Sequence, residues 1–148
     1  MAEHYIVTYD DVIRAHDAAL ENGGGIVGIK DESLILSAIG RPYQEFAGFI
    51  PYPTVIDKAG CLLHGFLNNH GFNDASKRTA WIVCNSFLHA EEHVVIFPIE
   101  LDYHWYDHLA LMVKEGWTVE QVTEWLAQFA INLEDVDDTI YISHSDDR

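Results

Sequence analysis

The segment from Ser76 to Leu88 is apolar on nearly every side when it is wound into a helix. Its apolar residues are Ala80, Trp81, Ile82, Val83, Cys84, Phe87 and Leu88. Such a helix is stable only where other elements cover most of its surface, because any side left in water would expose apolar groups. This segment therefore predicts a protein built around a central buried helix, with an orthogonal arrangement rather than a simple up-and-down bundle.

The rest of the chain predicts five more helices and little else. Their expected first residues lie near Thr8, Asp31, Thr54, Leu101 and Thr118. Thr8 and Thr118 have the spacing of a capping box, with Asp11 and Gln121 three residues further on. The short β-branched segment Val94–Phe97 predicts one strand that pairs with an edge elsewhere. The predicted fold class is therefore all-α: a compact orthogonal bundle of about six helices with at most a short strand or flap.

The length of 148 residues is typical of one domain and is sufficient to bury a core without disulfides or metal ions. We assign residues 1–132 to this domain. After Asn132 the sequence becomes acidic and loses any helical period. Residues 133–148 are therefore predicted to be an acidic C-terminal tail that is mobile or loosely docked.

The charge balance excludes several classes of partner. The chain has 24 acidic and 8 basic residues, for a formal net charge of −16. This charge repels phosphate backbones and anionic lipid surfaces, so we predict no nucleic-acid partner and no membrane partner. The first residues lack the basic start and apolar stretch of a signal peptide. Cys61 and Cys84 lie in apolar helical segments, as expected for buried, reduced thiols, and these features together predict a cytoplasmic protein.

Two of the few basic residues are adjacent, Lys77 and Arg78, where the loop His70–Ala75 meets the start of the central helix. A helix N-terminus offers unpaired N–H groups and a partial positive charge, and Ser76 is predicted to be the N-cap. Cations here oppose the helix dipole unless an anion or a carboxylate neutralises them, which indicates an anion-binding site. The alternative interpretation is a solvated turn whose cations pair with nearby acids.

The loop before this helix carries the other groups that a reaction site needs. His70 can act as a base near neutral pH, and Asp74 offers the hard oxygen that Mg²⁺ between phosphate oxygens prefers. Phe72 is apolar within a polar loop and is expected to anchor that loop to the core. A base, a metal ligand and a phosphate cradle within nine residues predict phosphoryl or nucleotidyl transfer.

The run His70–Ala80, HGFNDASKRTA, resembles the signature loop of the Fic/Doc (fido) superfamily. It is most similar to the Doc, or death-on-curing, branch, whose pattern is HxFxD(A/G)NKRTA. Gly28–Asp31 and Arg41-Pro42 also resemble that branch, which usually has arginine where Lys30 stands. The resemblance extends from about Ile6 to Phe129 and implies the fido fold.

The resemblance implies a role for each matching position. His70 matches the general base that activates a hydroxyl of a target protein, and Asp74 matches the residue that holds Mg²⁺. Asn73, Ser76, Lys77 and Arg78 match, or lie next to, the family residues that contact the nucleotide, ATP. Members with glycine in place of Lys77 typically transfer AMP, whereas the Doc branch transfers the γ-phosphate to elongation factor Tu and halts translation. The family also implies a Phd-type antitoxin as a partner of this toxin.

One position departs from the family pattern, since Ser76 stands where asparagine is usual. Serine can cap a helix but lacks the amide donor that could reach a phosphate. Three functions stay open: a Doc-like toxin that phosphorylates a translation factor, a Fic-type protein AMP transferase, and a catalytically weakened or silent binding module. Restoring asparagine is expected to raise activity.

Several other features are given structural roles. The loop Tyr43–Pro53 is expected to be the family's flap, which aligns the target segment by strand-like pairing. The glycines at 23–25 are expected to form a flexible connection. His104 and His108 have a spacing that can bind zinc, but no third ligand is evident, so we expect a structural or surface role. The remaining histidines are predicted to be packed and hydrogen-bonded (His16 and His64) or exposed (His89 and His93).

Overall fold

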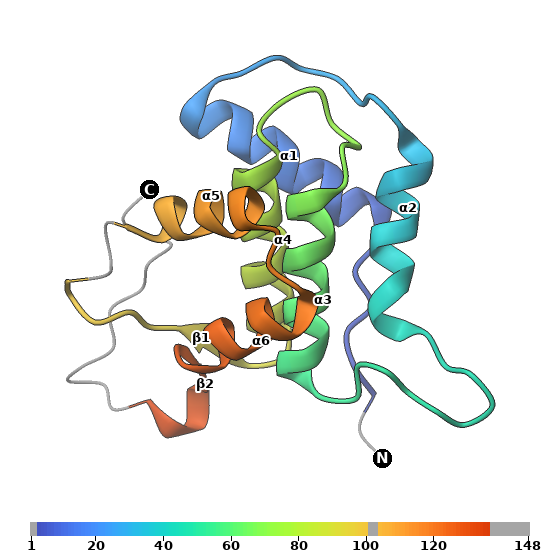
Figure 1. Ribbon diagram of the computed structural model, residues 1–148, viewed down its shortest axis with the longest axis vertical. Helices are drawn as coiled ribbons and strands as arrows, with labels where there is room; N and C mark the ends of the chain where they lie inside the picture. Colours follow the sequence, from blue (N-terminus) through green and yellow to red (C-terminus); the bar gives the residue numbers. More distant parts are fainter. Residues whose placement is uncertain (1–2, 101–103, 137–148) are drawn as a thin grey trace.

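The computed structural model describes residues 3–100 and 104–136 (Figure 1). Within these ranges the chain forms six α-helices: α1 (Tyr9–Gly23), α2 (Glu32–Gly40), α3 (Val55–Asn68), α4 (Ser76–Ala90), α5 (Trp105–Glu115) and α6 (Val119–Ala127). Two short 3₁₀ helices, η1 (Arg41–Tyr43) and η3 (Leu133–Asp135), and two strands, β1 (His93–Val95) and β2 (Ala130–Asn132), accompany them. The predicted all-α fold class is confirmed. None of the described helices is long and apolar enough to cross a membrane.

The helix starts follow the capping residues in the sequence. Complete capping boxes begin three helices: Thr8 with Asp11 in α1, Thr54 with Asp57 in α3, and Thr118 with Gln121 in α6. At α2, the carboxylate of Asp31 accepts a hydrogen bond from the backbone N–H of Ser33. Each such cap stabilises its helix by about 1 kcal/mol. These caps explain why the helix starts predicted at Thr8, Asp31, Thr54 and Thr118 are confirmed.

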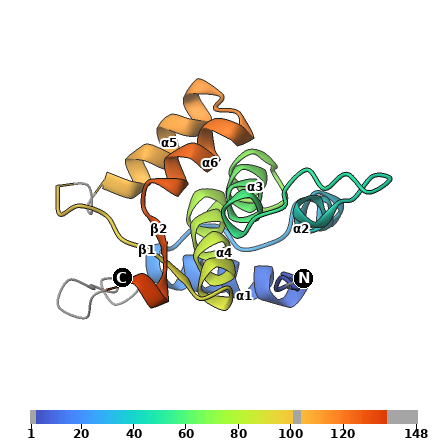
Figure 2. The same cartoon turned by 90° about the horizontal axis from the view of Figure 1, so that it is seen from below.

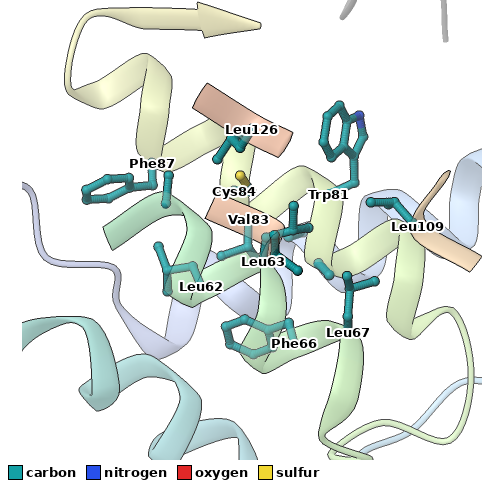
Figure 3. Close-up of a cluster of buried hydrophobic side chains, with 14 of the residues drawn as sticks. Leu62, Leu63, Phe66, Leu67, Trp81, Val83, Cys84, Phe87, Leu109 and Leu126 are labelled. Atoms are coloured by element: carbon teal, nitrogen blue, oxygen red, sulfur yellow. The ribbon is translucent and has the colours of Figure 1, made fainter. Parts of the chain in front are cut away.

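Helix α4 is the central helix, as its composition predicts. It packs against α1, α3, α5 and β1, and its most extensive contact is with α3. Val83, Cys84, Phe87 and Leu88 are each 2% exposed or less. The first three lie among apolar side chains of α3 (Figure 3). Burial of one large apolar side chain stabilises the fold by about 1.5–3 kcal/mol. On a further side, the ring of Trp81 stacks on Trp105 with the ring centres 5.2 Å apart.

The predicted strand exists, one residue earlier than expected at its start and two at its end. His93 pairs with Asn132, and Val95 pairs with Ala130, in an antiparallel register. This pairing half-buries His93, whose Nδ1 lies 2.7 Å from the carbonyl oxygen of Glu91, so the prediction of an exposed His93 is wrong. The chain continues from β2 into η3, and residues 137–148 of the predicted acidic tail lie outside the described residues.

Both cysteines are buried and free, as predicted. Burial raises the pKa of the Cys61 thiol to about 11 and raises the pKa of Cys84 further. Both thiols therefore stay protonated at neutral pH, which makes them unreactive. Their role is packing.

From α1 to α4, successive connections alternate between the two ends of the bundle (Figure 1). The α1–α2 and α3–α4 connections lie together at one end, whereas residues 43–53, between η1 and α3, lie at the other end (Figures 1 and 2). The two ends of α3 are about 21 Å apart, since the helix has 14 residues and rises about 1.5 Å per residue. The loop Tyr43–Pro53 therefore cannot lie over the signature loop, and its assignment as the flap is wrong.

Candidate active site

The loop His70–Ala75 is anchored by Phe72, as predicted. The Phe72 side chain is 5% exposed and its ring stacks on that of His16, with the ring centres 3.9 Å apart and an interplanar angle of 10°. Nε2 of His16 lies 3.0 Å from the backbone oxygen of Asp74. His16 is thus the packed, hydrogen-bonded histidine that the sequence predicts, and it fixes the loop at two points.

The segment 26–31 runs along the loop as a short antiparallel partner. Ile29 and Phe72 form an isolated β-bridge. Gly71 accepts backbone hydrogen bonds from Lys30 (2.8 Å) and Asp31 (3.0 Å). Asn73 donates through its backbone N–H to Gly28 and through its side-chain amide to Val27, both at 3.3 Å. Two of the three stretches that resemble the Doc branch, 28–31 and 70–80, are therefore parts of one site.

Gly28 is required for this pairing. Its φ is +117°, and a Cβ at this position would lie 2.8 Å from the amide nitrogen of Asn73. A side chain would therefore be strained by the backbone conformation and would also push Asn73 out of place.

The carboxylate of Asp74 is held in the charged form by the backbone. One oxygen accepts from the N–H of Ile26 at 3.0 Å, and the other accepts from the N–H of Ala75 at 2.8 Å. These two hydrogen bonds, in this order, are the main reasons that the pKa of Asp74 is below its usual value. A carboxylate oxygen can accept more than one bond, so Asp74 can still coordinate a cation.

Helix α4 begins without a capping side chain, which corrects the prediction for Ser76. The N-cap is Ala75, in the left-handed conformation with φ 63°, and Ser76 is the first helical residue. Asp74 has already turned the chain by accepting from Ala75, so the helix starts one residue earlier than a serine cap requires. The first-turn N–H groups have no partner within the helix and can bind an anion.

The two adjacent cations have different environments. Arg78 donates from Nη1 to the carbonyl of Ala19 at 2.5 Å and from Nη2 to the carbonyl of Gly24 at 2.8 Å. Its positive charge therefore lies at the C-terminal end of α1, where a helix dipole favours it. Among the described residues, Lys77 makes no side-chain hydrogen bond or ion pair, so its ammonium group can bind a ligand.

The glycines at 23–25 belong to this site and are not a free flexible connection. Arg78 holds the carbonyl of Gly24, and Asp74 holds the N–H of Ile26. A Cβ on Gly23 would lie 2.0 Å from Nη1 of Arg78. The glycine run therefore lets α1 end against the start of α4.

A cavity of about 270 Å³ lies at this junction. All six site residues predicted from the sequence line it: His70, Asn73, Asp74, Ser76, Lys77 and Arg78. The remaining lining combines one cation, Lys30, with an apolar wall that includes Leu67, Tyr106 and Val113. The His70 ring is exposed and makes no hydrogen bond or ion pair within the described residues, so it can accept a proton. The sequence signals missed the apolar wall, because nothing local distinguishes Tyr106 from a core aromatic.

The cavity fits a magnesium–phosphate group better than a metal held by protein alone. Across residues 3–100 and 104–136, no three His, Cys, Asp or Glu side chains are placed to hold a metal ion. Magnesium usually binds through one or two carboxylates, with substrate phosphates and waters completing its shell. Asp74 suits that role, and Lys30 and Lys77 supply charge that complements phosphate.

The other histidines have structural environments. His104 is an exposed residue 3.7 Å from the carboxylate of Asp107, and the His108 ring lies 5.8 Å from that of Trp125. His64 lies between Arg41 and the carbonyl of Trp117, 3.1 Å from the latter. No zinc site is formed by these residues within the described part of the chain.

Comparison with known proteins agrees with this geometry. The model of the Fic/DOC family matches residues 6–88, and the chain belongs to this family. The chain is also similar to Toxin Doc of Mycolicibacterium smegmatis (strain ATCC 700084 / mc(2)155), with 38% identity over 80 residues. That match covers 54% of this chain and 59% of the relative.

Proposed function

We propose that the protein is a Doc-like toxin that transfers the γ-phosphate of ATP to a hydroxyl of a target protein. The observation that carries the proposal is the single cavity at the start of α4. It combines an exposed histidine, one ordered carboxylate, an unpaired lysine and a helix N-terminus. These groups support the proposal because phosphoryl transfer depends mainly on positioning and on charge stabilisation, which they can supply.

In the proposed reaction, the imidazole of His70 takes the proton of the target hydroxyl. The hydroxyl oxygen forms a bond to the γ-phosphorus while the bond from that phosphorus to the β–γ bridging oxygen breaks, and ADP leaves. Lys77 and the first-turn N–H groups of α4 stabilise the charge on the phosphates. Magnesium held by Asp74 would neutralise phosphate charge.

In this proposal Arg78 positions the end of α1 in addition to lining the cavity. Two of its five N–H donors bind the carbonyls of Ala19 and Gly24, so it fixes the end of α1 against the nucleotide site. Lys77 is then the main side chain that contacts phosphate. The resemblance favours phosphate transfer over AMP transfer, because AMP-transferring members typically have glycine at this position.

The segment 26–30 takes the place that was expected for Tyr43–Pro53. In its bridge to Phe72, the hydrogen bonds are made by the residues on either side of Ile29, so the N–H and C=O of Ile29 point to the opposite edge. We infer that an extended segment of the target pairs with this edge beside His70. The proposed target is elongation factor Tu, with a halt of translation as the consequence, and the proposed partner is a Phd-type antitoxin.

The test uses purified elongation factor Tu with ATP labelled on either the α- or the γ-phosphate. The proposal expects transfer of the γ label alone, with dependence on Mg²⁺. Transfer of the α label would indicate a Fic-type AMP transferase instead. Absence of both labels, together with growth inhibition that survives His70→Ala, would indicate a silent binding module.

A further inference from the structure

The loop Tyr43–Pro53 is an ordered hairpin that extends from the body of the protein (Figures 1 and 2). Phe46 and Phe49 exchange both backbone hydrogen bonds, at 2.8 and 2.9 Å. Between them, Ala47 and Gly48 have φ values of 50° and 88°, as the two central residues of a type I′ turn require. The turn is therefore tight and defined.

The hairpin presents apolar side chains to solvent. Phe46 is 57% exposed and Phe49 is 66% exposed, and Ile50 next to them is also exposed. Helix α2, which leads into the hairpin, exposes Leu34 and Leu36. Two large aromatic side chains on an ordered turn are typical of a binding surface, because they offer contact area at low cost in conformational entropy.

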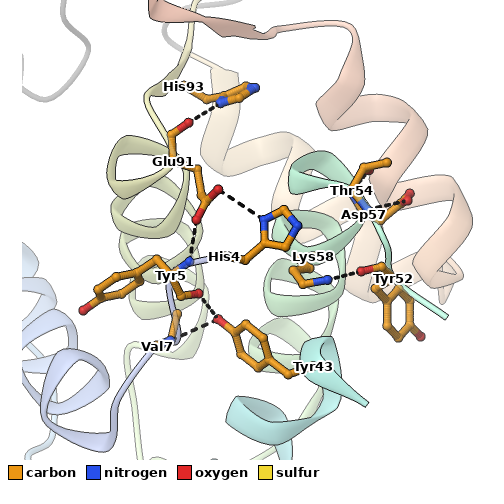
Figure 4. Close-up of polar contacts among 10 residues, drawn as sticks. All are labelled: His4, Tyr5, Val7, Tyr43, Tyr52, Thr54, Asp57, Lys58, Glu91 and His93. Carbon is orange, nitrogen blue, oxygen red and sulfur yellow. Dashed lines mark hydrogen bonds and ion pairs between the residues drawn. The ribbon is translucent and has the colours of Figure 1, made fainter. Parts of the chain in front are cut away.

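Both ends of the hairpin are fixed to the body. At its start, the hydroxyl of Tyr43 accepts from the N–H of Val7 at 3.0 Å and donates to the carbonyl of Tyr5 at 2.8 Å (Figure 4). At its end, Arg41 donates to the hydroxyl of Tyr52 at 3.2 Å. The ammonium group of Lys58 donates to the carbonyl of Tyr52 (Figure 4).

The contact between Lys58 and Tyr52 is buried. The Lys58 side chain is 5% exposed, and burial lowers its pKa. Burying an ammonium group destabilises a fold unless the group is well compensated. The charges of Asp57 and Glu91 act on this pKa in the opposite direction and partly compensate the ammonium group. The contact holds a solvent-exposed aromatic turn in one conformation, and such pre-organisation strengthens binding.

The charge around the hairpin selects the kind of partner. Between Arg41 and Lys58, which both face inward to Tyr52, the sequence has no basic residue, whereas Glu45 is exposed beside Phe46. The whole chain carries a net charge of −16. A second copy of the chain and an anionic membrane have the same sign of charge, so both are repelled.

We propose that the hairpin is a docking site for a basic amphipathic helix of a protein partner. Phe46 and Phe49 pack against the apolar face of that helix, and Glu45 meets the lysine or arginine side chains that flank this face. The hairpin lies at the opposite end of α3 from the cavity, so the partner binds without covering His70. This site is separate from the proposed catalysis, and its test does not depend on transfer activity.

The test measures binding of two labelled synthetic amphipathic helices to the full chain. Both helices have the same leucine face, and the opposite face carries lysines in one and glutamates in the other. We expect the leucine–lysine helix to bind, and the double variant Phe46→Ser, Phe49→Ser to weaken this binding about tenfold or more. The control, Ile99→Ser with Leu111→Ser, removes two exposed apolar residues outside the hairpin and its anchors and is expected to bind as the parent does.

A second variant keeps the proposal testable if the serine variant fails to fold. Glu45→Lys leaves both rings in place and is expected to weaken binding of the leucine–lysine helix, most strongly at low salt. Equal binding by the parent and the Phe46/Phe49 variant, or a preference for the leucine–glutamate helix, would overturn the proposal. Two other results would also overturn the proposal: self-association of the parent in analytical ultracentrifugation, or binding of the parent to phosphatidylserine vesicles, if the double variant abolishes it.

Discussion

Arg78 and Lys77 are adjacent in sequence, yet the structure predicts opposite consequences for their loss. Arg78→Met keeps most of the side-chain stem and removes two hydrogen bonds to carbonyls at the end of α1. Bonds of this kind contribute about 1.5–3 kcal/mol when they are buried, and we take about 1 kcal/mol for each because Arg78 is half-buried. The predicted loss of unfolding free energy is therefore about 2 kcal/mol.

For a chain of this length, that loss lowers the midpoint of thermal unfolding by about 4–8 °C. Thermal and urea unfolding followed by circular dichroism measure it directly. Lys77→Met is the matched control, because Lys77 is also half-buried and makes no side-chain hydrogen bond or ion pair among the described residues. Its midpoint is expected to stay within about 1 °C of the parent's, while its nucleotide affinity falls. Equal midpoints for Arg78→Met and Lys77→Met would refute the role given to Arg78.

Three further perturbations test other parts of the account. Ser76→Asn is expected to raise label transfer or toxicity, because it adds an amide donor at the first turn of α4, and an unchanged rate would show that serine suffices. Gly28→Ala is expected to destabilise the protein by about 1 kcal/mol or more in urea titrations, since φ is +117° and the new Cβ meets Asn73; no change would contradict the pairing of 26–31 with the loop. Burial, and after it the charge of Arg41, lowers the pKa of His64 below 6.5. As the pH drops below about 6.5, His64 is therefore protonated more readily in the unfolded state, and the stability of the folded state falls. His64→Asn should reduce that slope, and an unaltered slope would argue against it.

Local chemistry made most of the helix boundaries predictable. Thr8, Thr54 and Thr118 each have their capping partner three residues further on. The sequence pattern that predicts these helix starts therefore consists of the same residues that form the capping hydrogen bonds. Burial of α4 followed equally directly from its composition. The six site residues could be predicted to lie together because they are nearly contiguous, and a turn between two helices keeps such residues on one rim.

The errors came from contacts that are distant in sequence. The cap of α4 is Ala75 rather than Ser76, because Asp74 is held by Ile26 and turns the chain one residue early. Arg78 finds its partners, Ala19 and Gly24, at the end of α1, more than fifty residues away. The position of the flap could have been predicted from the sequence with one further argument. Connections between successive antiparallel helices alternate between the two ends of a bundle. The connection between α1 and α2, and not the loop before α3, therefore lies beside the connection between α3 and α4.

The central claim is that the cavity at the start of α4 transfers phosphate with His70 as the base. It is tested most directly by transfer of γ-label from ATP to elongation factor Tu, compared between His70→Ala and His89→Ala. Both histidines are exposed, so both variants should fold, but only His70 lines the cavity. The account predicts that His70→Ala lowers the rate at least about 10²-fold while His89→Ala leaves it unchanged. Equal rates for the two variants would contradict it.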